Sequence, residues 1–311
     1  MSRIAFIFPG QGSQYVGMGK DLIQTEIGEK LFSQADKALG FSLSRLCIDG
    51  PEEDLTQTYN TQPAILTIST IVFEILKEKG IKPEMVAGHS LGEYSALTAA
   101  DALSFTDAVQ LVRIRGQLMY EATKTIEGGM AAIIGLSAPA VEEICRQASS
   151  AGIVQAVNYN SPVQTVISGE KAGVDKAIEL AQDQGAKRAI ALSVSAPFHS
   201  SLMDPVAEKF QPELERVEIR DTSVPVMANF TAQPETEAGE IRRNLIKQVN
   251  GPVHWSDSVQ SMIFQGIDTF VEVGPGKVLT GLMRKTNREV ACSPVEKPES
   301  IDALIEKLHQ G

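Results

Sequence analysis

The segment Gly88–Gly92, with the sequence Gly-His-Ser-Leu-Gly, is the part of this chain best suited to chemistry. Gly-x-Ser-x-Gly is typical of a sharp strand-to-helix turn that exposes one serine as a nucleophile in α/β enzymes. Residues 84–87 before it predict a short buried strand, and residues 94–100 after it predict a helix of small residues. Ser90 is therefore the candidate nucleophile. The alternative is an ordinary serine in a glycine-flanked turn.

A serine hydroxyl is a weak nucleophile at neutral pH and needs a general base, most often a histidine. Of the four histidines, His199 is the best candidate, because the segment Ser195–Ser200 follows a predicted strand and its loop can return to the edge of the sheet. His89 is adjacent to Ser90 in sequence, but it points away if the turn has the expected shape. For His199 the alternative is a histidine that only packs in a loop or core.

A third group must hold the base in one orientation. In α/β hydrolases an acidic residue between the serine and the histidine in the chain does this. Several acidic residues lie in that interval, from Asp101 to Asp183, but no motif marks any one of them. A backbone carbonyl serves equally well, and the sequence leaves both possibilities open.

Arg115 is the most informative residue outside the serine motif. If residues 106–120 form one helix, its neighbours three and four positions away are all apolar, whereas Arg113 has small or polar neighbours and is expected to face solvent. A guanidinium on a buried stripe is costly unless it is paired, and it binds a carboxylate in bidentate geometry. The partner is either an internal Asp or Glu or a carboxylate of the substrate.

Two glycine-rich stretches follow predicted strands and need comparison with phosphate-binding loops. Residues 9–15 contain Gly-x-Gly, but Tyr15 stands where a dinucleotide fingerprint requires glycine. The stretch 274–277 has Val271 where the first glycine of a P-loop falls. Neither predicts a nucleotide site. The turn around Gln11 is still able to aim backbone N–H groups at an oxyanion.

Short β-branched runs alternate with helical stretches along the chain, which predicts an α/β fold with parallel strands. One of these runs predicts a strand at residues 188–194, and residues 233–240 are predicted to form an exposed loop. From residue 127 the spacing tightens into strand, helix, strand, strand, helix, strand, the order of a ferredoxin-like unit. We therefore predict an α/β-hydrolase-like parallel-sheet core made of residues 1–126 and 198–311, with a ferredoxin-like insert at residues 127–197. Ligands often bind in the cleft between two such parts.

The composition sets broad limits on function. The 311 residues include 28 basic and 39 acidic side chains, and the net charge of −11 disfavours binding to nucleic acid or to a membrane surface. No apolar run approaches the roughly 18 residues that span a bilayer, and no secretory pattern is present, so we expect a cytoplasmic protein. Three cysteines and four histidines show no metal-ligand spacing, so we expect no metal.

Five segments, taken together, resemble the malonyl-CoA:acyl-carrier-protein transacylases of fatty acid synthesis. The likeness extends from about residue 3 to residue 285, and the segments keep the order and spacing of that family. They are Phe8–Gln14, Gly88–Glu93, Arg115–Gly116, Pro197–His199 and Glu272–Gly276.

The resemblance implies a ping-pong acyl transfer without a cofactor. His199 would take the proton of Ser90, which attacks the thioester of malonyl-CoA, while the backbone N–H groups of Gln11 and Leu91 hold the oxyanion. The thiol of acyl carrier protein would then attack the malonyl-serine ester. Arg115 matches the arginine that grips the free malonyl carboxylate in this family.

The resemblance also assigns roles to residues around the serine and the base. In related polyketide acyltransferases a branched residue after the serine and a phenylalanine before the histidine accompany malonyl selection, and Leu91 and Phe198 fit that pattern. The histidine of the family is oriented by a backbone carbonyl from a loop that here spans Asn250–Trp255. Some relatives have glutamine where His254 stands, and a structural role is expected for its side chain.

The resemblance implies an enzyme that moves malonyl from malonyl-CoA to acyl carrier protein for fatty acid biosynthesis. A monomer is the usual state of that family and is expected here on the same ground. A discrete malonyl acyltransferase of polyketide synthesis is the first alternative. A serine esterase or thioesterase, or a non-catalytic docking subunit with the same fold, are the others. The sequence does not identify the carrier protein or the surface that docks it.

Overall fold

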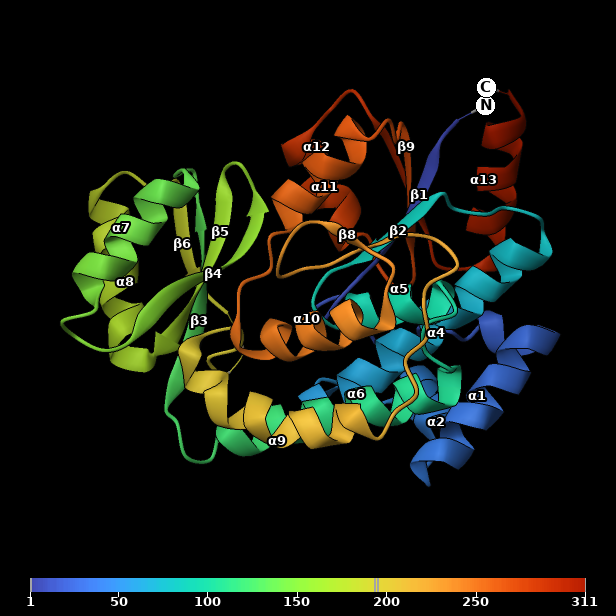
Figure 1. The fold of residues 1–311 in the computed structure, drawn as a ribbon, viewed down its shortest axis with the longest axis horizontal. Coiled ribbons are helices and arrows are strands. Elements are labelled where there is room, and N and C mark those ends of the chain that lie inside the picture. Colours follow the sequence, from blue (N-terminus) through green and yellow to red (C-terminus); the bar gives the residue numbers. More distant parts are fainter. Residues whose placement is uncertain (1, 193, 195, 311) are drawn as a thin grey trace.

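The computed structural model describes residues 2–192, 194 and 196–310. Within them, a six-stranded sheet with the order β10-β9-β1-β2-β7-β8 forms the centre of the larger part (Figure 1). Its first five strands are parallel, and only the short β8 is antiparallel to its neighbour. The strands are β1 (Ile4–Phe8), β2 (Met85–Gly88), β7 (Val226–Met227), β8 (Pro234–Glu235), β9 (Thr269–Val273) and β10 (Ala291–Val295).

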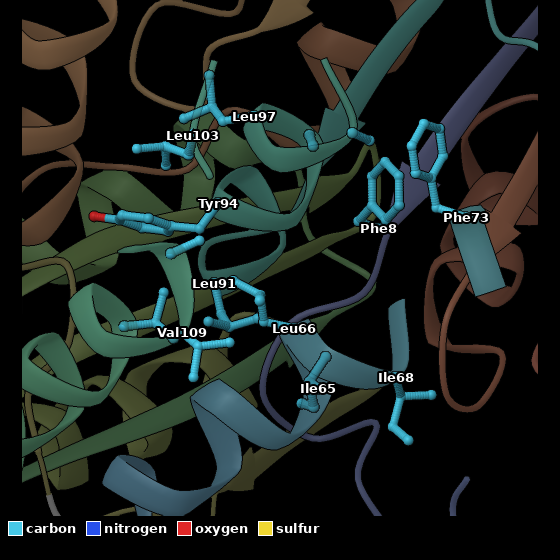
Figure 2. Packing of buried hydrophobic residues seen from close by; sticks show 14 of the residues in the cluster. Phe8, Ile65, Leu66, Ile68, Phe73, Leu91, Tyr94, Leu97, Leu103 and Val109 are labelled. Carbon is cyan, nitrogen blue, oxygen red and sulfur yellow. The ribbon is translucent and has the colours of Figure 1, made fainter. Parts of the chain in front are cut away.

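The central strand β1 shows why the sheet is buried on both faces. Phe6 and Phe8 point into one apolar cluster, and Ala5 and Ile7 point into the other, as the two-residue period of a strand requires. Figure 2 shows Phe8 beside Phe73 in the first cluster, with ring centroids 6.4 Å apart. A parallel sheet needs helices on both faces to complete such packing.

The larger apolar cluster joins the sheet to most of the long helices. These are α1 (Glu26–Leu39), α2 (Leu43–Asp49), α4 (Thr58–Glu78), α5 (Leu91–Ala99), α6 (Phe105–Ala122), α9 (Asp204–Glu215), α10 (Ala238–Asn250) and α13 (Pro298–Gln310), with the short α3 (Glu52–Leu55) before α4. The opposite face is covered by α11 (Trp255–Phe264) and α12 (Val278–Thr286).

A second sheet lies to one side of the first (Figure 1, green and yellow). It is antiparallel, with the order β4-β5-β3-β6, and two helices pack on one of its faces. Along the chain its elements are β3 (Gly128–Ile134), α7 (Ala138–Ala148), β4 (Val154–Ser161), β5 (Gln164–Glu170), α8 (Lys171–Asp183) and β6 (Arg188–Ala191). This is the order strand, helix, strand, strand, helix, strand that the sequence predicts.

The two sheets are joined beside the serine turn by main-chain hydrogen bonds. Tyr159 N–H donates to the carbonyl of Val253 at 2.9 Å, and Val253 N–H donates to the carbonyl of Val157 at 2.8 Å. Val253 thus pairs with the edge strand β4 in parallel. The open face of the second sheet is thereby held next to the end of β2.

The strands differ from the sequence-based predictions in three places. Residues 233–240 read as an exposed loop, yet they contain β8, in which Glu235 is buried. The edge strand β10 is not predicted, because it contains a proline and little of it is buried. The strand predicted to reach Val194 ends at Ala191. Ser193 and Ser195 lie outside the described residues.

The serine turn depends on two glycines. A Cβ on Gly88 would collide with the backbone of Gly92, and a Cβ on Gly92 would collide with the carbonyl oxygen of Phe8 in β1. Both obstacles are main-chain atoms, which cannot move aside as a side chain can. The close approach of β1, β2 and the start of α5 therefore requires glycine at both positions.

Gly92→Ala should lower the free energy of unfolding by at least about 2 kcal/mol, because the backbone must shift to admit the methyl group. Gly281→Ala is the matched control, since Gly281 lies on α12 with open space around its Cα, and alanine there should stabilise the helix by about 0.5–1 kcal/mol. Urea denaturation followed by circular dichroism measures both. Equal stability of the two variants would contradict the close packing described.

Candidate active site

Ser90 lies where β2 ends and α5 begins. It is the N-cap of α5, with φ 51° and ψ −105°, a strained conformation for a residue other than glycine. The turn leaves the hydroxyl at the N-terminal end of the helix, where backbone N–H groups favour negative charge. The geometry is that of a nucleophile elbow.

His199 contacts the serine directly. Its Nε2 lies 2.8 Å from Ser90 Oγ, and its Nδ1 lies 2.8 Å from the carbonyl oxygen of Gln248. Because a carbonyl only accepts, Nδ1 carries the proton and Nε2 is free to accept the hydroxyl proton. Burial and the nearby charge of Arg115 lower the pKa of His199 to about 3, so the ring is a neutral base.

The carbonyl that orients His199 differs from the one expected. It belongs to Gln248 in the last turn of α10, not to His254. The backbone N–H of His254 donates instead to the carbonyl of Asn229, and its ring stacks on Tyr159 with centroids 5.0 Å apart. A C-terminal helix turn leaves carbonyls without intrahelical partners, which is why α10 and not the following loop presents the acceptor. In the described residues no acidic side chain bonds His199.

Arg115 is only 1% exposed and is held by uncharged groups. Its Nη1 donates to Gln62 Oε1 at 2.9 Å, and its Nη2 donates to Gln248 Oε1 at 3.0 Å and to Ser90 Oγ at 3.2 Å. The ring of Tyr94 lies 5.4 Å from the guanidinium carbon. No Asp or Glu forms an ion pair with Arg115 in the described part of the chain, so its charge is available to a carboxylate that enters the site.

Arg113, on the same helix, is half-buried rather than exposed as predicted. Its guanidinium lies over the rings of Phe41 and Tyr59, at 4.9 and 4.7 Å, and donates to the carbonyl of Tyr59 and to Asn60 Oδ1. Aromatic rings from α4 and the loop after α1 cover it, which the spacing within one helix does not reveal.

Three side chains of the site were not found by sequence analysis: Gln62, Asn229 and Gln248. Asn229 Oδ1 accepts from the backbone N–H of Ser90 at 2.6 Å, and its Nδ2 donates to the carbonyl of Gly88 at 2.6 Å. All three are buried amides. Amides carry no motif in a single sequence. A polar residue within a helix is the only signal for Gln62 and Gln248, and Asn229, which lies in the turn after β7, lacks even that.

The two expected oxyanion donors, Gln11 and Leu91, line the same cavity as Ser90 and come from different elements. Leu91 is the first residue of α5, and Gln11 follows β1, where its side chain donates to Thr58 Oγ1 at 3.3 Å. Neither backbone N–H has a protein acceptor among the described residues. Two free donors beside a nucleophile are the usual requirement for holding a tetrahedral oxyanion.

A cavity of about 120 Å³ opens beside Ser90. About four water molecules occupy this volume in liquid water. The cavity therefore suits a short acyl group rather than a long chain. The side chains of Phe198 and Met119 form part of the apolar lining of the cavity. Met130, on β3 of the second sheet, adds to that lining. The lining residues are Gln11, Gln62, His89, Ser90, Leu91, Arg115, Met119, Met130, Asn158, Leu192, Val194, Phe198 and His199.

His89 serves packing between the two sheets. Its Nε2 lies 2.8 Å from Asn160 Oδ1 in β4, and its ring lies 5.7 Å from that of Trp255. Burial lowers the pKa of His89, so it is neutral. In the described residues its ring forms no hydrogen bond with the Ser90 hydroxyl, which bonds His199 instead.

The described residues contain no group of three His, Cys, Asp or Glu side chains placed to hold a metal ion. In the same residues, no helix is long and apolar enough to cross a membrane. The chemistry available at this site is nucleophilic attack by a serine with a neutral histidine as base, beside a buried guanidinium and two free N–H groups.

Comparison with known proteins gives a family for this constellation. A profile described as Acyl transferase domain matches residues 5–310. The chain is 50% identical over 312 residues to a malonyl CoA-acyl carrier protein transacylase of Bacillus subtilis (strain 168), covering 100% of this chain and 98% of that one.

Solved structures of similar proteins indicate the same family. An acyl carrier protein S-malonyltransferase from Vibrio cholerae superposes with a TM-score of 0.95 at 42% identity, over 97% of this chain and 100% of that chain. A malonyl-transacylase in complex with its type II PKS acyl-carrier protein superposes with a TM-score of 0.96 at 40% identity, over 98% of this chain and 100% of that chain.

The fold and the matching family profile are those of an acyltransferase. Within that class, the chain belongs to the malonyl CoA-acyl carrier protein transacylase family.

The lowered pKa of His199 predicts an unusual pH profile. A base with the ordinary pKa of 6.5 would lose reactivity about tenfold by pH 5.5, because most of it would be protonated. With the pKa at about 3, the neutral form persists. The rate of Ser90 acetylation by p-nitrophenyl acetate should therefore change less than about twofold between pH 7.5 and 5.5. Ser90→Ala is the blank, and a tenfold fall in a folded sample would contradict this state of His199.

Proposed function

We propose that the protein transfers malonyl from malonyl-CoA to the phosphopantetheine thiol of acyl carrier protein through an ester on Ser90. The observation that carries this proposal is Arg115, a buried guanidinium without an ionic partner in the described residues, 3.2 Å from the nucleophilic oxygen. A malonyl group has a free carboxylate two bonds from the carbon that the serine attacks. The site thus offers one group for each end of the substrate.

In the first half-reaction, Ser90 Oγ attacks the thioester carbonyl carbon and its proton moves to His199 Nε2. The oxyanion forms opposite the N–H groups of Gln11 and Leu91. When it collapses, the C–S bond breaks, the imidazolium returns the proton to the CoA sulfur, and malonyl-Ser90 remains. Arg115 is the second-largest cause of the low pKa of His199. A malonyl carboxylate on Arg115 offsets that charge and makes the base stronger.

In the second half-reaction, the thiol of the carrier protein gives its proton to His199 Nε2 and attacks the ester carbonyl. The same N–H groups hold the second oxyanion. The C–O bond to Ser90 breaks, and the serine takes the proton back from the imidazolium. The free enzyme is regenerated, and the two substrates never need to occupy the site together.

Selection of malonyl rests on size as well as charge. Phe198 stands directly before the base, and Leu91 directly after the nucleophile, and both line the small cavity. Branches on the acyl group would meet these two side chains. We assign Phe198 and Leu91 to substrate selection, and His254 to packing of α11 against β4.

The proposed architecture is an α/β-hydrolase-like core of residues 1–126 and 198–311, interrupted by a ferredoxin-like insert at residues 127–197. The separate second sheet and its strand order support it. The cavity then lies at the junction, with Met130 and Asn158 from the insert. A cytoplasmic location, a monomeric state and the absence of a cofactor belong to the same proposal.

We place the enzyme in fatty acid biosynthesis. A polyketide pathway is the alternative, because one similar structure is a malonyl-transacylase bound to a type II PKS acyl-carrier protein. A serine esterase shares the nucleophile and base but has no use for a free buried guanidinium beside them. Rapid release of malonate without a carrier protein would favour the esterase.

Incubation with malonyl-CoA, followed by proteolysis and mass spectrometry, should show a malonyl adduct on the peptide that contains Ser90. Addition of phosphopantetheinylated acyl carrier protein should remove it and malonylate the carrier. Ser90→Ala is the control and should show no adduct. An adduct on another residue, or none, would contradict the proposed function.

Arg115→Ala should reduce malonyl loading at least about hundredfold, because the substrate carboxylate would be buried without its partner. Acetyl loading from acetyl-CoA should change far less, since acetyl has no such carboxylate. Arg113→Ala is the matched control from the same helix and should leave the ratio of malonyl to acetyl loading unchanged. Equal losses of both substrates in Arg115→Ala would show that the guanidinium is only structural.

A further inference from the structure

Glu93 is a fully buried acidic residue one turn into α5, and neither half-reaction uses it. Its Oε2 accepts from Gln248 Nε2 at 2.7 Å and from the backbone N–H of Asn229 at 3.2 Å. Its other oxygen, Oε1, has no protein partner in the described residues. Burying a carboxyl group here is costly, so its contacts need an explanation.

Gln248 is the residue through which Glu93 reaches the reacting groups. The side-chain Nε2 of Gln248 donates both to Glu93 Oε2 and to the carbonyl of Ser90, the latter at 2.8 Å. Its Oε1 accepts from Arg115, and its own backbone carbonyl accepts from His199. One amide thus touches the nucleophile turn and the carboxylate-binding arginine, while its main chain orients the base.

The orientation of this amide is decided by Glu93. An amide has one face that accepts and one that donates, and Ser90 C=O and Glu93 Oε2 together use both N–H groups. If the amide were reversed, its N–H groups would face the donor Nη2 of Arg115, and its oxygen would face two acceptors. With Glu93 in place, the only compatible arrangement directs Oε1 of Gln248 at Arg115.

Asn229 gives Glu93 a second connection to the site. The main chain of Asn229 is held by Glu93 Oε2, and its side chain bridges the backbone N–H of Ser90 and the carbonyl of Gly88. At the third position of a helix, a glutamate usually accepts a hydrogen bond from the N-cap backbone N–H of the same helix. Here Glu93 accepts from the backbone N–H of Asn229, and the Asn229 side chain accepts from the N-cap N–H of Ser90.

The charge state of Glu93 suits this role. Burial, followed by the nearby carboxyl of Glu235 on β8, raises the pKa of Glu93, and only Arg115 on α6 among the charged groups facing it opposes this. Glu93 therefore holds its proton more strongly than an ordinary glutamate. A protonated Glu93 still accepts through one oxygen but does not cancel the charge that Arg115 offers to a substrate.

We infer that Glu93 is a positioning residue for malonyl selection, which accepts from Gln248 and Asn229 and so holds the Gln248 amide with its oxygen on Arg115. The inference rests on the proposed function, because it concerns how the malonyl carboxylate is held. It assigns Glu93 no contact with the substrate. Its effect is on the guanidinium that makes that contact.

The test compares three variants by the ratio of kcat/KM for malonyl-CoA to that for acetyl-CoA. Glu93→Leu removes the acceptor and should lower this ratio about tenfold or more, the range for losing a hydrogen bond to a charged group. Glu93→Gln keeps one acceptor oxygen and should stay within about threefold of the unaltered protein. Glu272→Gln alters a buried carboxyl on β9, which accepts from the backbone N–H groups of Leu279 and Thr280 and not from Gln248, and should leave the ratio unchanged.

Partial loss of the fold lowers kcat/KM for both substrates equally and so does not change their ratio. If Glu93→Leu does not fold, Glu93→Ala removes the same acceptor without adding apolar bulk, keeps Gln248 Oε1 for Arg115, and should lower the ratio as well. An unchanged ratio in the folded variant, or an equal fall in Glu93→Gln, would overturn the inference. Failure of the unaltered protein to form malonyl-Ser90 would instead overturn the proposed function, so the two failures are distinguishable.

Discussion

The site depends on a guanidinium that is buried without a counter-ion among the described residues. Arg115 is held by two glutamine oxygens, an aromatic ring and the serine hydroxyl, all of them uncharged. These acceptors bond Nη1 and Nη2, while the buried Nε has no hydrogen-bond partner in the described residues. None of them opposes the positive charge, at a cost that an entering anion can offset. In the proposed function, the energetic penalty of burying this charge is the basis of selection for an acyl group with a free carboxylate.

The fold maintains this arrangement by bringing distant segments together. Three helices on the same side of the central sheet supply the polar side chains of the site: Gln62 on α4, Arg115 on α6 and Gln248 on α10. Ser90 lies among them at the end of β2. The strained backbone of Ser90 is tolerated because Asn229 and Gln248 bond it on both sides. Each of these contacts spans a long stretch of sequence, so the site forms only when the whole core is folded.

Sequence patterns revealed the groups that carry their own local signal. The glycine-flanked motif located Ser90, and the apolar stripe of α6 indicated that Arg115 is buried. The stripe also predicted an exposed Arg113, which is wrong, because the covering rings come from other elements. The partner of His199 was placed in the wrong loop for the same reason. Which carbonyl reaches the ring depends on where α10 ends relative to a loop about 50 residues earlier, and a single sequence holds no record of that.

Elements whose sequence has a clear hydrophobic pattern were likewise predictable from the sequence. The edge strands of the central sheet were not. Strands buried on both faces, such as β1 and β2, form continuous apolar runs. The edge strands β8 and β10 contain prolines and are recognised only from their neighbours in the sheet. Glu93 could be located in the motif but not interpreted, since its contacts lie in the turn after β7 and on α10, both far along the chain.

A crystal structure of the malonyl-loaded protein tests the central claim most directly. The account predicts an ester on Ser90 Oγ, with both oxygens of the free carboxylate within hydrogen-bond distance of the Arg115 guanidinium and the ester carbonyl oxygen facing the N–H groups of Gln11 and Leu91. A malonyl carboxylate that points to solvent, while Arg115 stays bonded to Gln62 and Gln248 alone, would contradict it.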